Sequence, residues 1–123
     1  MKVLVLKLGE NSPSGFLLRE TETMGMTVGM TRLSRGENVG AHSTGQNEEV
    51  LVFLSGRGLL IADGHQHEVG SGYVAYIGPH IEHDVLNTGQ EELRYVFIVA
   101  PARSDGVRDI RESSQPSSGQ ANL

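Results

Sequence analysis

The chain contains no cysteine, and this absence narrows the chemistry open to it. Without thiols there can be no disulfide, no thiolate metal ligand and no cysteine nucleophile. Any bound metal ion must therefore be held by nitrogen and oxygen donors. A chain without cysteine also fits a reducing compartment, and we expect a cytoplasmic protein.

Long apolar runs and an excess of basic charge are also missing. No run approaches the ~18 apolar residues that a membrane-spanning helix needs. The apolar residues between Lys2 and Lys7 are too few for a signal-peptide core. The net charge of −5 leaves no basic stripe that could neutralise phosphates. We therefore expect neither a membrane nor a nucleic acid as partner.

Glycine is abundant and spaced along the chain, with 16 residues in 123. This is roughly twice the typical ~7% usage and suits short strands joined by tight turns. No helical periodicity competes with this pattern, so we predict an all-β domain of the jelly-roll or small-barrel type. The strands are expected at Val3–Leu8, Met24–Leu33, Glu49–Ser55, Arg57–Ala62, His65–Val69, Tyr73–Ile77, His83–Leu86 and Leu93–Val99.

Two features of the pattern set the turns and the domain boundary. Asp63-Gly64 tolerates positive φ and predicts a two-residue hairpin. A chain of this length supports one core, which we assign to residues 1–100. Residues 101–123 are polar and rich in serine and arginine, and we predict a disordered tail there.

Acid and imidazole side chains occur at positions expected to face the inside of the barrel. Alternation along a strand places Glu49 on the face of Leu51 and turns Glu48 the other way, while His83 shares the face of Val85. A lone buried carboxylate costs several kcal/mol, and a bound cation with neutral imidazoles turns that cost into binding energy. If the strands pair, Glu49 and His83 meet His42 in a divalent-metal site.

These residues lie in two motifs that resemble those of the cupins. The first cupin motif, G-x5-H-x-H-x4-E-x6-G, fits Gly36 to Gly56 with His42 and Glu49, except that Thr44 stands at the second histidine. The second, G-x5-P-x-G-x2-H-x3-N, fits Gly72 to Asn87 with His83 as its histidine, whereas Gly78 and His80 replace its proline and second glycine. The resemblance implies a single-domain cupin of double-stranded β-helix type.

The resemblance also implies a transition-metal site with His42, Glu49 and His83 as ligands. Thr44, a poor ligand, would face a metal-bound water, and His80 lies on a loop that could turn it inward or outward. Two histidines and one carboxylate suit Fe(II), and Mn, Zn, Ni and Co tolerate the same donors. The rival interpretation is a cupin that has lost its metal, with the same three residues hydrogen-bonded around water.

A second pair, His65 and His67, has the spacing of a metal pair in the expected hairpin. In the family this hairpin lies away from the ligand-bearing motifs, so we expect ordinary surface or partly buried histidines there.

The leading functional hypothesis is a metal-dependent enzyme, of isomerase or lyase type or of dioxygenase type. Its substrate would be a small polar molecule, such as a sugar or an organic acid, that chelates the ion. The alternative is a non-catalytic module that binds a small molecule with a degenerate or absent metal site. For either function we expect a homodimer, because Val3–Leu8 and Val50–Leu54 offer an apolar edge and face.

Overall fold

The computed structural model describes residues 2–103, which form eight antiparallel strands and no helix. No segment of this part of the chain could therefore cross a membrane as a helix. The strands are β1 (Gly15–Leu18), β2 (Thr27–Leu33), β3 (Asn47–Ser55), β4 (Arg57–Ala62), β5 (His65–Gly70), β6 (Val74–Ile77), β7 (His83–Asn87) and β8 (Leu93–Pro101). The predicted all-β jelly-roll fold is confirmed.

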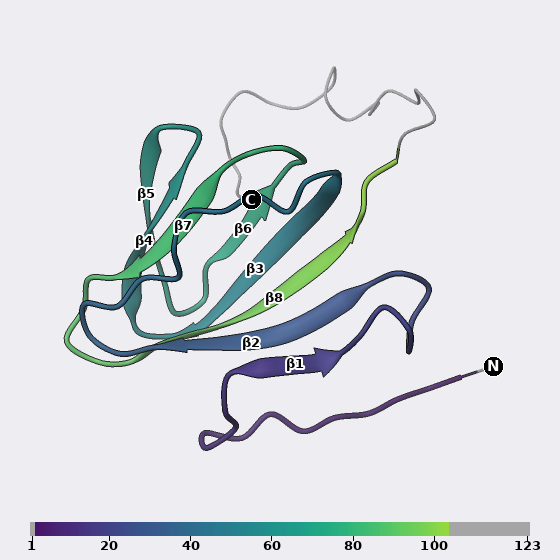
Figure 1. The fold of residues 1–123 in the computed structure, drawn as a ribbon. Coiled ribbons are helices and arrows are strands. Elements are labelled where there is room, and N and C mark those ends of the chain that lie inside the picture. Colours follow the sequence, from purple (N-terminus) through teal and green to yellow (C-terminus); the bar gives the residue numbers. More distant parts are fainter. Residues whose placement is uncertain (1, 104–123) are drawn as a thin grey trace.

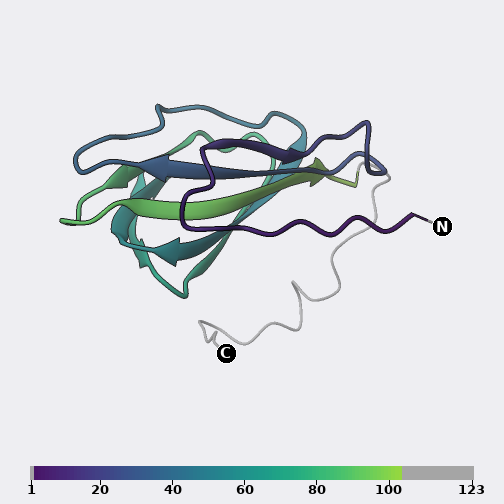
Figure 2. The same ribbon diagram turned by 90° about the horizontal axis from the view of Figure 1, so that it is seen from below.

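The strands form two sheets. One has the order β1-β2-β8-β3-β6 and the other the order β5-β4-β7. Figure 1 shows β4, β5 and β7 on one side of the molecule and β2, β3 and β8 on the other, and Figure 2 gives the view from below. The segment before β3 adds to the smaller sheet through two isolated bridges to β7, Asn38 with Leu86 and His42 with His83. That segment carries the first histidine of the expected site.

Register in the larger sheet fixes which side chains face the interior. β8 pairs with both β2 and β3, so Val99 lies opposite Glu49 and Phe97 opposite Leu51. Because directly opposed residues share a face, these four side chains point into the barrel. The expected alternation is confirmed, and Glu48 lies on the other face, where it accepts a 2.8 Å hydrogen bond from the Tyr76 hydroxyl.

The apolar core fills the end of the barrel where β3 finishes and β8 begins. Leu93, Phe53 and Leu51 are at most 2% exposed there. The Phe53 and Tyr95 rings pack with centroids 5.0 Å apart. Asn87 is buried among them and donates to the carbonyl oxygens of Leu33 and Glu91, both at 2.9 Å. This end is therefore closed.

Two glycines, Gly64 and Gly29, allow backbone arrangements that a larger residue would disfavour. Asp63 and Gly64 have φ of 52° and 77°, which confirms the predicted hairpin between β4 and β5. At Gly29, in the middle of β2, an added Cβ would lie 2.2 Å from the Phe97 ring. Phe97 can therefore lie across β2 only because this position has no side chain.

Some of the expected strands are wrong. Val3–Leu8 forms no strand, and it runs outside the barrel with Val5 87% exposed (Figure 1). Its apolar pattern is typical of a strand, but within the described residues no sheet edge pairs with it. β1 was not predicted, and β2 begins at Thr27 because Met24 belongs to a turn. In the predicted tail, Pro101 still belongs to β8, and residues 104–123 lie outside the described residues.

Candidate metal centre

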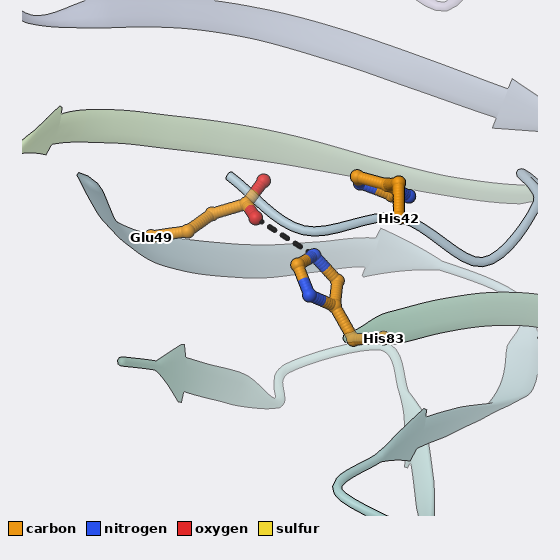
Figure 3. A group of neighbouring side chains, drawn as sticks. All are labelled: His42, Glu49 and His83. Carbon is orange, nitrogen blue, oxygen red and sulfur yellow. Dashed lines mark hydrogen bonds and ion pairs between the residues drawn. The ribbon is translucent and has the colours of Figure 1, made fainter. Parts of the chain in front are cut away.

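Three separate elements bring His42, Glu49 and His83 together. Glu49 lies near the start of β3, His83 begins β7, and His42 is held beside β7 by two backbone hydrogen bonds with His83, of 2.9 and 2.8 Å. One nitrogen or oxygen donor from each of the three residues lies within 4.8 Å of the others. Figure 3 shows the three side chains pointing toward one space.

Backbone carbonyls orient both imidazoles. Nδ1 of His42 lies 2.7 Å from the carbonyl oxygen of Gly40, and Nδ1 of His83 lies 2.9 Å from that of Ile81. A carbonyl oxygen can only accept, so each Nδ1 carries a proton and donates it. This leaves the Nε2 lone pair as the metal-binding atom, the arrangement that typically fixes a metal-ligating histidine.

Glu49 and His83 are buried against each other. Glu49 is 6% and His83 3% exposed, and Nε2 of His83 lies 3.0 Å from Oε1 of Glu49 (Figure 3). Burial raises the pKa of Glu49, and the nearby His83 and His42 only partly offset this. Because His83 already donates from Nδ1, the bond to Glu49 needs one further proton. That proton occupies the place that a cation would take.

The residues fit a transition-metal ion. Imidazole nitrogen and carboxylate oxygen bind such ions at about 2.0–2.2 Å, so two ligands on one ion are up to ~4.4 Å apart. The observed limit of 4.8 Å is close to this span. A buried carboxylate with a raised pKa and two oriented imidazoles is the donor set that a divalent ion would stabilise.

A cavity of about 250 Å³ adjoins the three residues. Ligand pockets for drug-sized molecules start at about 300 Å³, so this cavity suits a small metabolite. Five apolar side chains line it: Val39, Leu51, Val85, Phe97 and Val99. The site therefore combines a polar cluster with an apolar wall.

The comparisons with known proteins agree with this geometry. A family model for the cupin domain matches residues 29–99, more than half of the chain and both ligand-bearing motifs. The chain belongs to the cupin family. This cupin is 32% identical over 71 residues to an uncharacterized protein of Methanocaldococcus jannaschii. The matched region is 58% of this chain and 57% of that relative's length.

Solved structures place the whole barrel among the cupins. A cupin protein from Bacteroides fragilis aligns with a TM-score of 0.71 and 25% identity, over 89% of this chain and all of that one. A predicted oxalate decarboxylase from Thermotoga maritima aligns with a TM-score of 0.61, over 80% of this chain and all of that one. Its identity is 17%, so this second likeness shows the fold alone.

Asp84 is a residue of the site that sequence reasoning missed. Its carboxylate accepts hydrogen bonds of 2.8 Å from the Gly40 amide and from the Asn38 side chain. Partial burial acts to raise the pKa of Asp84, but these bonds and one from the Val85 amide outweigh it and lower the pKa. Asp84 thus holds the segment that carries His42. Alternation after His83 only predicts that it points outward.

Tyr95 and Thr31 are a second omission. Both line the cavity, and they hydrogen-bond to each other. Burial raises the pKa of Tyr95 to about 12, so the phenol stays neutral at physiological pH. No motif marks this pair, but the inward alternation of β8 could have placed Tyr95 on the cavity wall.

The remaining histidines and Thr44 lie outside the three-residue group. Thr44 lines the cavity, and its hydroxyl lies 3.3 Å from the carbonyl oxygen of Asn47. His80 is exposed, has a φ of 62°, and donates its backbone amide to Gly45. His65 and His67 are exposed on β5 and line a separate groove. Within residues 2–103, only His42, Glu49 and His83 form such a cluster.

Proposed function

We propose that this cupin is a metal-dependent enzyme of isomerase, lyase or dioxygenase type, acting on a small polar molecule such as a sugar or an organic acid. The observation that carries the proposal is the convergence of two Nε2 atoms and one buried carboxylate on the cavity. His42, Glu49 and His83 would hold a divalent ion, Fe, Mn, Zn, Ni or Co. Such an ion supplies Lewis-acid polarisation or activation of O₂.

The chain's own residues would prepare the substrate for this chemistry. The carbonyls of Gly40 and Ile81 keep the two imidazoles turned toward the cavity. The apolar side chains of the wall lower the local polarity, which strengthens electrostatic interactions beside them. The Thr44 hydroxyl, at the cavity wall, would hydrogen-bond a water molecule beside the ion.

Metal analysis of protein purified without a histidine tag tests the proposal. We expect close to one transition-metal ion per chain, and its loss in His42→Ala and Glu49→Ala. His65→Ala is the matched control, because His65 is exposed on β5. Metal binding should also release the proton shared by Glu49 and His83. A wild-type protein that takes up no divalent ion would refute the proposal.

One observation favours the second candidate function, a non-catalytic module that binds a small molecule. Thr44 occupies the place of a family histidine, and its hydroxyl contacts Asn47 instead of joining the cluster. His80, which could have replaced that histidine, is exposed outside the cluster. A metal-free protein that still binds a ligand in this cavity would support the module over the enzyme.

The apolar N-terminal segment supports a homodimer. Val3, Val5 and Leu6 are 73, 87 and 53% exposed, and a row of such side chains gains free energy by burial against a second copy. Light scattering after size exclusion should find a dimer, and Val5→Glu should shift it toward monomer. His65→Glu, which adds the same charge at an exposed position on β5 in the smaller sheet, is the control. The cytoplasmic location stays a prediction from the sequence.

A further inference from the structure

The charges around the cavity restrict what it can bind. No lysine or arginine of residues 2–103 lines the cavity. The basic groups near Glu49 are the imidazoles of His83 and His42. Within the described part of the chain, a ligand in the cavity therefore meets no lysine or arginine side chain.

The arginines gather elsewhere. Arg32 and Arg94 line a surface hollow beside Ser55, at the opposite end of β3 from Glu49. Arg32 is paired with Glu92 at 2.7 Å. These side chains cannot serve as counter-charges in the cavity.

A charge count then selects the ligand. A divalent ion with the Glu49 carboxylate and two neutral imidazoles has a net charge of +1. A chelating monoanion makes this site neutral. A dianion would bring a second negative charge to an apolar wall close to the Asp84 carboxylate, with no lysine or arginine of residues 2–103 lining the cavity to pair with it, which is unfavourable.

The apolar side chains that line the cavity indicate the chemistry of the part of the ligand that does not bind the metal. Phe97 and Val99 follow each other on the inward face of β8, and Val39 and Val85 come from the facing side. Thr31 and Tyr95 add two hydroxyl groups to this lining. An apolar group of a few carbons would bury its surface there, at roughly 25 cal/mol per Å².

We infer that the substrate is a small monocarboxylate that chelates the metal through its carboxylate and a neighbouring oxygen and packs a compact apolar group against Phe97, Val99 and Val39. This inference rests on the proposed metal site and narrows its substrate class. We expect phosphorylated sugars and dicarboxylates to bind more weakly, because each carries a second charge that no lysine or arginine of residues 2–103 in the cavity lining would pair with.

Two 2-oxo acids with the same chelating head test the inference. Calorimetric titration of the Mn²⁺-loaded protein should show 4-methyl-2-oxopentanoate binding at least ~10-fold more tightly than 2-oxoglutarate, whose second carboxylate replaces the branched apolar end. Equal or tighter binding of 2-oxoglutarate overturns the inference. So does binding of neither acid to protein that metal analysis shows to be loaded, although the metal site then stands.

A single substitution in the cavity should change the preference for 4-methyl-2-oxopentanoate over 2-oxoglutarate. Val39 lines the cavity but is 42% exposed, so Val39→Lys can add a cation without disturbing the core. We expect the preference to shift at least ~10-fold toward 2-oxoglutarate. Val74→Lys is the control, because Val74 is 67% exposed and lines another groove. An unchanged ratio in Val39→Lys overturns the inference, and failure to bind Mn²⁺ in the wild type overturns both proposals.

Discussion

The two ends of β7 both bury a polar side chain, but they satisfy it in different ways. At the closed end, Asn87 makes three hydrogen bonds to backbone atoms of Leu33, Glu91 and Gly89. At the open end, the Nε2 atom of His83 has only Glu49, and burial raises the pKa of that carboxyl. A buried polar group whose partners are all backbone stabilises the fold. A buried polar group whose only partner is a second ionisable group, as His83 has in Glu49, can exchange that partner for a bound metal ion.

Asn87→Ala should break the closed end. The change leaves two carbonyl oxygens and one amide, in one buried and two partly buried bonds, without their partner, so we expect the free energy of unfolding to fall by about 3 kcal/mol. Urea denaturation in the presence of a chelator measures this. Asn11→Ala, at an exposed position, should change stability by less than ~0.5 kcal/mol. Similar losses in the two variants would contradict the assignment.

Tyr95 lies between the two ends and should make stability depend on alkaline pH. Its folded-state pKa is raised to about 12 from 10.0, so its contribution is complete below pH 10 and is lost as the pH rises through 12. We expect a loss of roughly 2 kcal/mol over this window. Tyr95→Phe should lose ~1 kcal/mol at pH 7, with its hydrogen bond, but lack the alkaline decrease. Parallel pH profiles would refute this account.

Asp84→Asn should affect only the open end. The amide keeps the size of the side chain but weakens its hold on Gly40 and Asn38, so His42 loses its fixed position. Partners that orient metal ligands are typically worth 10–100-fold in affinity, and we expect about 10-fold weaker Zn²⁺ binding. Glu68→Gln, on the exposed β5, should bind Zn²⁺ as the wild type does. Equal weakening in both variants would point to a general charge effect.

Glu49→Gln should stabilise the protein without metal. The native carboxyl keeps its proton to higher pH than the ordinary value of 4.5, so the stability of the metal-free protein falls as the pH rises through this window. The amide has no charge to bury, and we expect a gain of about 1 kcal/mol at pH 8 in chelator. Thermal melts from pH 4 to 8 measure it. A destabilised variant at pH 8 would argue that Glu49 serves packing.

The sequence predicts the strands and turns of the barrel better than it predicts contacts between distant segments. Alternation on β3 assigns Glu49 inward and Glu48 outward, because sheet geometry has a strict period of two. The Asp63-Gly64 turn is equally local. Val3–Leu8 has a strand-like pattern, but whether it pairs depends on a partner edge that no local signal reveals. Asp84 acts on Gly40, 44 residues earlier, and such a contact follows only from the assembled sheet.

The way in which His42 is attached has a consequence for the history of such proteins. His42 lies on a surface segment that joins β7 through isolated bridges, whereas Glu49 and His83 belong to strands of the barrel. Substitutions in that segment can alter coordination without opening a void in the core. Related proteins with this fold can therefore change their metal coordination, and with it their reaction, through substitutions in the short surface segment that carries His42, while the core of the barrel stays the same.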